Sequence, residues 1–444
     1  MQATPDDAFS YLSPIGYRSS SSCGYCRRNG SVTGHCYYAR AKAMSPVYYQ
    51  ALIDRCWRRS GSLLYKPNQR DACCPHYTLR LDSSKFRASR DQRQAINRFN
   101  KYVIGDAYVK EAARRYPKSR EQARKRDTEF DLVERIHESE SASLKQPPEP
   151  AHELVVTLEP DDFTEEKYAV FENYQRIVHQ ESPSDISRDG FRRFLCSSPL
   201  RRESVVTESG EEKQLGSFHH CYRLDGKLVA IGVLDLLPDC VSAVYFLYHE
   251  SIHKWSPGKL GALREIALAA EGGYRWWYSG FYIHTCPKMR YKIDFSPQQI
   301  LDPNCLEWVD LTSEILAKFD DHGYLNLSET SKGQDSLQPQ GNSPTEVKDQ
   351  RTDTHGSEDS EGDEEISLFS SNMPGISSID EISSIDFDSV LIRLNRGFCL
   401  AGDLFEWQDE DINVEGGPKR MVAELIAAVG PSLMSSTCLD FRRA

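Results

Sequence analysis

Features of secreted, membrane and nucleotide-dependent proteins are absent from this sequence. Met1 to Tyr17 has no basic segment followed by an apolar run, so no secretory signal peptide is predicted. No apolar run approaches the roughly 20 residues that cross a bilayer. The longest run, Val241 to Tyr248, has the length of a buried strand. These absences predict a cytoplasmic or nuclear protein without a membrane partner.

Motifs of several enzyme classes are lacking as well. The sequence has no Gly-x-Ser-x-Gly nucleophile elbow, no dinucleotide-binding glycine fingerprint and no protein-kinase motif set. It therefore predicts neither a serine hydrolase of that kind nor a nucleotide cofactor. A transferase that uses an already activated acyl donor needs none of these motifs.

Charge is unevenly distributed along the 444 residues, whose formal net charge is −12. Residues 1–110 hold 18 Lys and Arg against 7 Asp and Glu, whereas residues 326–388 hold 3 against 15. An apolar content of 39% is sufficient for a folded core. The basic N-terminal part is therefore expected to fold and to bind a polyanion, and the acidic, Ser-rich segment is expected to be disordered.

Composition and hydrophobic periodicity divide the chain into six predicted parts. In order, they are a flexible tail (1–21), an N-terminal domain with a cysteine cluster (22–107), a charged helix and linker (108–153), a C-terminal acyltransferase domain (154–325), a disordered acidic insert (326–388) and a C-terminal element that packs on the body (389–444).

The C-terminal acyltransferase domain is predicted to contain antiparallel strands followed by a helix and a further strand. The three predicted strands are Gly216–Leu224, Leu228–Leu236 and Val241–Tyr248. Asp225-Gly226 is typical of a hairpin turn between the first two. A helix is predicted over Pro257–Ala270 and an aromatic strand over Trp276–His284. This order is that of acyl-transfer domains of the acetyltransferase kind, and it predicts an α+β fold.

Four cysteines have spacing typical of a metal site. In a chain without a secretory signal, the thirteen cysteines are expected to be reduced, and most of them to be small buried apolar residues. Cys23 and Cys26 are separated by two residues, and Gly24 permits a tight turn. With Cys73 and Cys74 they would bind zinc or an iron–sulfur cluster, in a structural or redox role. The alternative is that all four are buried structural cysteines.

Basic and aromatic residues are interspersed in the same domain. The set comprises Arg55, Trp57, Arg58, Arg59, Tyr65, Lys66, Arg80, Lys85, Arg87, Arg90 and Arg93. Such a mixture can bind phosphates and stack on unpaired bases. The alternative is a solvated basic face.

Two further segments carry features of anion binding. Pro287 ends the predicted aromatic strand, so the cations at 288, 290 and 292 would project from a turn, on one side if the segment is extended. Ser256, Pro257 and two glycines begin the predicted helix and leave backbone N–H groups free for an anion. The alternatives are an ordinary charged strand edge and an ordinary capped helix.

Several of these segments together resemble the arginyl-tRNA–protein transferase family. In the N-terminal domain the similar segments are Ser22–Cys26, Asp54–Gly61 and Cys73–Arg80. In the C-terminal half they are Ser187–Leu195, Asp235–Phe246, Lys259–Ile266 and Gly280–Lys292. Cys56 stands where the family usually has glycine, and His249-Glu250 where it usually has an aspartate. With its acidic insert, the chain resembles the fungal type.

The resemblance implies transfer of arginine from Arg-tRNA to the α-amino group of proteins that begin with Asp, Glu or oxidised Cys, which marks them for ubiquitin-dependent degradation. It also implies two acetyltransferase-like (GNAT-like) halves and a mostly monomeric protein. One alternative is an acetyl-CoA-dependent N-acetyltransferase, although Pro257–Gly261 does not match the phosphate loop of that class. The other is a non-catalytic RNA-binding adaptor with a metal knuckle.

Arginine transfer requires an amine beside an activated ester, a base for that amine and donors for the oxyanion. The predicted substrate-binding residues are Arg58, Arg59, Lys259, Arg264, His284, Lys288, Arg290, Tyr291 and Lys292. The candidate bases are Asp294 and His219, and the predicted metal ligands are Cys23, Cys26, Cys73 and Cys74.

Overall fold

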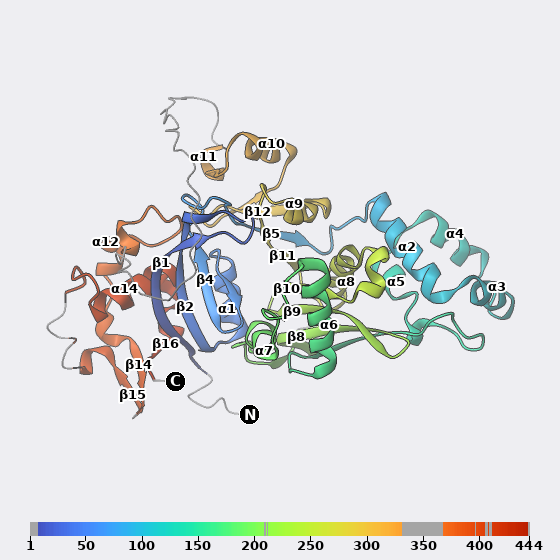
Figure 1. Cartoon of the computed structure of the whole chain (residues 1–444), viewed down its shortest axis with the longest axis horizontal. Coiled ribbons are helices and arrows are strands. Elements are labelled where there is room, and N and C mark those ends of the chain that lie inside the picture. Colours follow the sequence, from blue (N-terminus) through green and yellow to red (C-terminus); the bar gives the residue numbers. More distant parts are fainter. Residues whose placement is uncertain are drawn as a thin grey trace.

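The chain folds into two β-sheets with helices packed on them (Figure 1). The computed structural model describes residues 8–207, 210, 212–330, 367–395, 397–404, 407 and 411–442. Antiparallel pairings predominate in both sheets, which confirms the predicted α+β class. Among these residues, none of the helices is both long and apolar enough to span a bilayer.

The first sheet takes its strands from both ends of the chain, in the order β15-β14-β16-β1-β2-β4-β3. They are β1 (Ser10–Ser22), β2 (Asn29–Ala43), β3 (Arg58–Ser60), β4 (Leu63–Pro67), β14 (Leu391–Leu394), β15 (Gly397–Leu400) and β16 (Thr437–Asp440). Helices α1 (Pro46–Ile53) and α14 (Pro418–Val429) share one apolar core with this sheet.

Strand β1 covers most of the segment for which a flexible tail was predicted. It pairs antiparallel with β2 and parallel with β16, more than four hundred residues away along the chain. Residues 10–21 are therefore held in the sheet, and this part of the prediction is corrected. The sequence of residues 10–21 does not by itself indicate a strand, because the strands β2 and β16 that pair with it lie elsewhere in the chain. Residues 1–7 lie outside the described part.

The second sheet has the order β13-β12-β5-β11-β10-β9-β8-β6, with β7 paired to β8. Its strands are β5 (Tyr77–Asp82), β6 (Leu154–Pro160), β7 (Glu203–Val206), β8 (Glu212–Leu224), β9 (Lys227–Leu236), β10 (Cys240–Tyr248), β11 (Trp276–Tyr282), β12 (Gln298–Leu301) and β13 (Trp308–Asp310). The predicted hairpin is confirmed, because Asp225 and Gly226 have φ of 51° and 75°, as a two-residue turn requires.

Helices cover both faces of the second sheet. Helices α2 (Arg90–Ile104), α5 (Leu132–His137) and α8 (Pro257–Glu271) share one apolar cluster with it. On the other face, α6 (Glu165–Tyr174) and α7 (Arg188–Leu195) form a second cluster around Phe191 and Ile231. The predicted helix at Pro257 is confirmed and continues to Glu271.

The chain crosses from the first sheet to the second between β4 and β5. Strand β5 pairs with β11 on one side and with β12 on the other, although β3 and β4 belong to the first sheet. A buried ion pair also joins the sheets: Arg59 of β3 donates from Nε and Nη2 to Asp235 of β9, at 2.8 and 2.6 Å. Strands from both sides of residue 107, the predicted domain boundary, lie in the second sheet. The domain boundary itself stays a prediction.

The described residues begin again at Ser367, inside the segment predicted to be a disordered insert. Helix α12 (Ile379–Ser383) lies in this part, and Leu368, Ile382 and Phe387 are buried in the core of the first sheet. The acidic composition concealed these widely spaced apolar residues, which find their partners on α14. Residues 331–366 of the predicted insert lie outside the described residues.

Close packing of α8 against β10 makes a prediction about Gly261. A Cβ added there would lie 2.6 Å from Cζ of Phe246, so the ring must move. We expect Gly261→Ala to lower the free energy of unfolding by about 1–3 kcal/mol, although alanine is the better helix former. Chemical denaturation measures the change.

The matched control is Gly258→Ala in the same helix, where an added Cβ meets nothing within 4 Å. This variant should be neutral or slightly stabilising. Equal stability of the two variants would contradict the packing argument.

Candidate functional site

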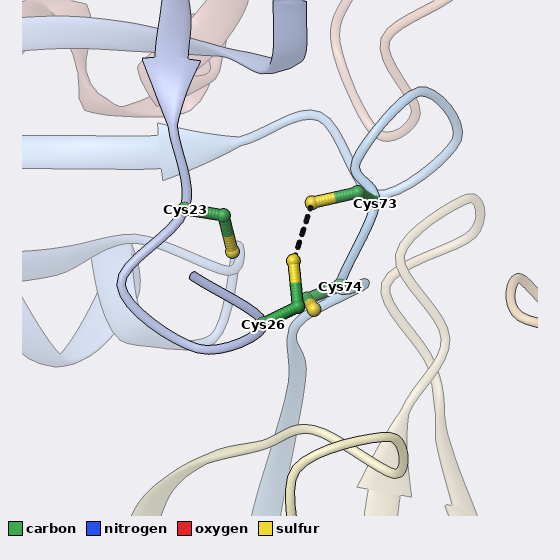
Figure 2. Close-up of side chains that lie close together, drawn as sticks. All are labelled: Cys23, Cys26, Cys73 and Cys74. Carbon is green, nitrogen blue, oxygen red and sulfur yellow. Dashed lines mark hydrogen bonds between the residues drawn. The ribbon is translucent and has the colours of Figure 1, made fainter. Parts of the chain in front are cut away.

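The four predicted metal ligands lie together, as Figure 2 shows. Cys23 and Cys26 come from the loop between β1 and β2, and Cys73 and Cys74 from the crossing between β4 and β5. The four Sγ atoms all lie within 4.8 Å of one another, and those of Cys26 and Cys73 are 3.6 Å apart. His35, Cys36 and His76 lie outside this group.

The turn that joins the first two cysteines closes through backbone hydrogen bonds. The N–H of Arg27 donates to the carbonyl of Cys23 at 2.9 Å, and the N–H of Cys23 donates to the carbonyl of Arg28 at 3.1 Å. Arg27 takes the left-handed conformation with φ of 58°, a conformation expected of Gly24 from the sequence. Both thiols thus face the second pair.

The geometry fits one cation held by four thiolates. Tetrahedral zinc with bonds of about 2.3 Å separates its sulfurs by about 3.8 Å, close to the spacing found here. The N–H of Arg28 lowers the pKa of Cys26 to about 7, whereas burial raises the pKa of Cys73. Without a cation, four thiolates this close would repel one another, so the donor set suits a metal.

The cysteine cluster packs directly on the segment that follows β11. Buried Cys74 shares an apolar cluster with Ile283 and Cys286, and the hydroxyl of Thr285 donates to Sγ of Cys74 at 3.5 Å. A metal in the cluster would therefore help to fix the position of the residues that begin at 283.

A series of aromatic contacts connects the same cluster to the end of β11. The ring of Tyr25 lies 5.1 Å from that of His76, which lies 5.2 Å from Phe281. The guanidinium of Arg58 stands over Phe281 at 4.7 Å. Burial lowers the pKa of His76 to about 4, so its ring is neutral. Its contacts are those of a packing residue between the cysteines and the strand.

Strands β10 and β11 separate next to this point. They are parallel and pair only over Cys240–Ser242 with Trp276–Tyr278. Beyond that, β10 continues with β9 as its partner and β11 with β5, each after an irregularity in register. Ala243 to Phe246 are all half-buried, and the hydroxyl of buried Ser279 has no hydrogen-bond partner among the described residues. Unpaired backbone at the middle of a sheet is typical of a binding site.

Two titratable groups of opposite charge face the place where the strands separate. Glu265 on α8 is 3% exposed and accepts a hydrogen bond from Nε1 of Trp277 at 2.9 Å. Lys292 is half-buried, but its amine turns inward, donates to the carbonyl of Phe281 at 2.8 Å and would meet a Cβ on Gly280 at 3.5 Å.

Burial shifts the pKa of each group toward 7, upward for Glu265 and downward for Lys292. It raises the pKa of Glu265 to about 7, against hydrogen bonding from Trp277 and attraction by Lys292. It lowers the pKa of Lys292 to about 7, helped by the charge of Arg58. Both groups can therefore gain or lose a proton near neutral pH, as a general base must.

The cations that follow β11 do not share one side, because the segment is helical. Helix α9 (Pro287–Arg290) and the turn η5 (Tyr291–Asp294) replace the expected extended chain, with proline at the first helical position. Lys288 and Arg290 are exposed and have no ion pair within the described part of the chain. The turn thereby separates two surface cations from the inward amine of Lys292.

Aromatic side chains surround these surface cations. Tyr291 exposes 45% of its side chain. The one-turn π-helix η3 (Gln175–His179) brings His179 within 3.1 Å of the hydroxyl of Tyr245. Burial lowers the pKa of His179, and the charge of Lys288 lowers it further. Tyr174 lies with its ring 6.1 Å from Tyr245. These rings could stack on bases or pack on a peptide.

Other predicted substrate-binding residues are engaged in internal contacts. Arg59 forms a buried ion pair with Asp235. Arg264 pairs with Glu140 and donates to the carbonyl of Ile136 at 2.9 Å. Lys259 pairs with Asp91 of α2. His284 bridges the hydroxyl of Tyr282 and a carboxylate oxygen of Asp320, at 2.6 and 2.7 Å.

The two candidate bases lie in different surroundings. His219 is fully buried, its Nε2 donates to the carbonyl of Leu195 at 3.0 Å, and burial lowers its pKa to about 4. Asp294 is exposed at the end of η5. Sequence reasoning overlooked Glu265, because a glutamate on a helix is ordinarily solvated. Its one signal is its position within a helix that is apolar on most sides.

Comparison with known proteins gives a consistent result. The family model described as "Arginine-tRNA-protein transferase, N terminus" matches residues 21–94, and "Arginine-tRNA-protein transferase, C terminus" matches residues 166–302. The first match ends within α2, and the second covers α6 to β12. Together they include the cysteine cluster and the whole site around β10 and β11.

Three curated relatives extend the comparison. "Arginyl-tRNA--protein transferase 1" of Drosophila melanogaster is 29% identical over 73% of this chain and 87% of its own length. The protein of the same name in Saccharomyces cerevisiae is 32% identical, over 58% of this chain and 50% of its own. "Aspartate/glutamate leucyltransferase" of Pseudomonas fluorescens is 28% identical, over 63% and 90%. A solved structure, L-PGS from Bacillus licheniformis, matches 47% of this chain and 46% of its own at 9% identity, with a TM-score of 0.27 that carries no weight.

Removal of the first cysteine pair should abolish metal binding. We expect the double variant Cys23→Ala, Cys26→Ala to lose its bound metal, because two ligands cannot hold a closed tetrahedral site. Elemental analysis for zinc and iron, with acid-labile sulfide, measures the content per chain. Exposed Cys305 lies outside the cluster, and Cys305→Ala provides the control. A double variant that keeps its metal would show that the ligands lie elsewhere.

The carboxyl of Glu265 should give the stability a pH dependence. The unfolded chain loses this proton near the ordinary value of 4.5, the folded chain near 7. The folded state thus binds more protons in that window, so the free energy of unfolding falls as pH rises through it, by about 3 kcal/mol.

Glu265→Gln should remove this part of the pH dependence while it keeps an acceptor for Trp277. Denaturation between pH 4.5 and 7 measures both proteins, and Glu134→Gln at an exposed position is the control. Parallel curves for the wild type and Glu265→Gln would disprove the assignment.

Proposed function

Because the chain belongs to the arginyl-tRNA–protein transferase family, we propose that it is an aminoacyltransferase that moves arginine from Arg-tRNA to the N-terminal amine of a protein. Both family models match in their natural order, and the relatives in fly and yeast carry that name. The observation that carries the proposal is the inward amine of Lys292 beside the separated strands β10 and β11.

The chemistry of the proposed reaction suits these groups. The aminoacyl ester is already activated, so the protein must hold an amine against it and accept a proton. The low pKa of Lys292 leaves its amine partly neutral at pH 7, and we assign it the role of base, which was predicted for Asp294 or His219. Glu265 is a positioning residue, since its charge acts on Lys292 from the far side. Unpaired N–H groups where β10 leaves β11 would stabilise the oxyanion.

The acceptor and its fate complete the proposal. A bacterial relative is named for aspartate and glutamate, which supports an acceptor with an acidic first residue. Lys288 and Arg290 are exposed cations beside the site and would bind that carboxylate or a phosphate of the tRNA. Arginylation would mark the acceptor for ubiquitin-dependent degradation. A mostly monomeric state and a cytoplasmic or nuclear location stay predictions.

The fold supports a finer assignment of the two halves. A parallel strand pair that separates within an otherwise antiparallel sheet agrees with an acetyltransferase-like architecture, and we extend that description to the second sheet. The first sheet would then be the other acetyltransferase-like half, and it carries the cysteine cluster at the loop between β1 and β2. Its last three strands come from the C-terminal element.

The cysteine cluster would hold a structural metal in this scheme. Cys23, Cys26, Cys73 and Cys74 supply four thiolates and leave no open position for a reacting group. Their close spacing favours one ion over a four-iron cluster, in which each thiolate binds a different iron and the sulfurs are farther apart. A bound metal would hold Cys74 in place and, through packing, the residues around Ile283.

Transfer of labelled arginine tests the proposed function. We expect arginine to pass from charged tRNA to a peptide that begins with Asp, and not to the same peptide that begins with Ala. Scintillation counting and peptide mass give the product. Absence of transfer to either peptide would overturn the proposal, and equal transfer would remove the acidic selection.

Substitutions of lysine should distinguish the base from the surface cations. Lys292→Met removes the amine, so kcat should fall by about 10²–10⁴-fold with a smaller change in KM. Lys288→Met at an exposed position should chiefly raise KM for the acidic peptide. Steady-state kinetics over pH 6–9 measure both, and an unchanged pH profile of kcat/KM in the Lys292 variant would exclude it as the base.

A further inference from the structure

A basic helical arm lies between the two family matches. Helices α3 (Asp106–Arg115) and α4 (Arg120–Thr128) follow α2 and lead back through α5, and they lie at one end of the long axis of the molecule, beyond α8 (Figure 1). Residues 95–165 fall in neither match. Helices α3 and α4 therefore lie between the segments that the two family models match.

The charge of the arm exceeds what its folding requires. Residues 90–126 contain twelve Lys and Arg but only four Asp and Glu. None of the residues of helix α4 whose burial is described is buried, so packing of an apolar face does not explain its sequence. Its stability comes from a capping box between Ser119 and Gln122. Arg120, Arg124 and Lys125 are exposed and form no ion pair among the described residues. Self-repulsion of this kind persists where it serves an anionic partner.

A cavity lined by arginines lies at the base of the arm. Its volume is about 250 Å³, and its lining comprises Arg90, Arg93, Gln94, Asn97, Arg126, Thr128, Glu129, Phe130 and Arg135. Arg126 and Arg135 share the single carboxylate of Glu138, whereas Arg90 and Arg93 have no carboxylate partner within the described part of the chain. Planar guanidinium groups in a concave site match the geometry of phosphate oxygens.

A hydrogen bond connects helix α2, which contributes to the lining of this cavity, to the turn that carries Lys292. Gln92, between the two unpartnered arginines, donates from Nε2 to the carbonyl of Asp294 at 3.0 Å, at the end of the turn that carries Lys292. Asp91 pairs with Lys259 at the start of α8. The same first turn of α2 thus touches both the reaction site and the arginine-lined cavity.

We propose that the arm, residues 90–135, binds backbone phosphates of the tRNA body while its aminoacyl end lies at the separated strands. The inference rests on the proposed function, and it names the surface that would hold the rest of the donor. The contacts are to phosphates, so they carry affinity and little sequence preference. An RNA is long enough to reach from the turn at Asp294 to α4, whereas a small anion is not.

Charge reversal on α4 tests the proposal without disturbing the core. In the triple variant Arg120→Glu, Arg124→Glu, Lys125→Glu, the affinity for uncharged full-length tRNA should fall at least about 10-fold at low salt. The slope of log K against log salt concentration should become shallower by about 2. Arg93→Glu in the cavity should act in the same direction.

The matched control is Arg40→Glu, an exposed arginine on β2 of the first sheet that also lacks an ion pair among the described residues. It should leave the tRNA affinity and the salt slope unchanged. A loss in Arg40→Glu equal to that in Arg93→Glu would indicate a general effect of net charge and would overturn the assignment to the arm.

Arginine transfer separates the arm from the reaction site. With charged full-length tRNA, KM of the triple variant should rise about 10-fold and kcat should be kept. With an arginine-bearing minihelix limited to the acceptor stem, the variant should equal the wild type. Equal loss with both donors, or no loss with either, would overturn the proposal. If the wild type transfers no arginine but binds tRNA with an arm-dependent salt slope, the proposed function fails and the arm proposal stands.

Discussion

The position of strand β5 constrains the rest of this molecule. It is hydrogen-bonded on both sides within the second sheet, while the strand before it belongs to the first. A strand with two neighbours cannot be withdrawn without leaving many backbone groups unpaired, so the crossing between the sheets is fixed. That crossing carries Cys73 and Cys74, and it meets the loop of Cys23 and Cys26 between β1 and β2 of the first sheet. The cysteine cluster is thus a consequence of how the two sheets are connected.

Buried charge is used in two different ways around this crossing. Arg59 with Asp235 and Arg264 with Glu140 are closely matched pairs, whose partners come from distant elements and join them. Removal of one partner from such a pair is costly, because the other remains charged in an apolar interior. Glu265 and Lys292 form no ion pair within the described part of the chain, and each has a neutral hydrogen-bond partner there instead. A mismatch of this kind makes protonation adjustable, which a structural pair would not permit.

The cysteine cluster and the reacting groups are mechanically connected. The residues from Ile283 to Lys292 pack on the cysteines at one end and place an amine beside Phe281 at the other. Loosening the cysteine loop would therefore change the position of Lys292 without any contact between them. The helical arm adds an independent surface that meets the same segment at Asp294. The cysteine cluster, the proposed reaction site and the basic arm thus all meet the segment from Ile283 to Asp294.

The sequence by itself determined those features that depend on local spacing. Apolar segments bounded by turn residues predicted β8, β9 and β10, the pair Asp225-Gly226 predicted the turn between the first two, and capping signals predicted α8. The four cysteines were identified from their spacing and from a family resemblance that the comparisons confirm. Such patterns are sufficient because a turn, a helix start or a pair of metal ligands is specified within a few residues.

Only the tertiary structure decided which charged residues are available. Arg59 and Arg58 are neighbours in a basic sequence, yet both are buried, one against a carboxylate and the other over an aromatic ring. Lys292 turns inward while Lys288 stays at the surface, because Pro287 begins a helix and not an extended edge. Glu265 acquires a raised pKa from its burial in the surrounding core, against the hydrogen bond from Trp277. Burial and the pKa depend on partners far apart in the chain, and no local pattern contains that information.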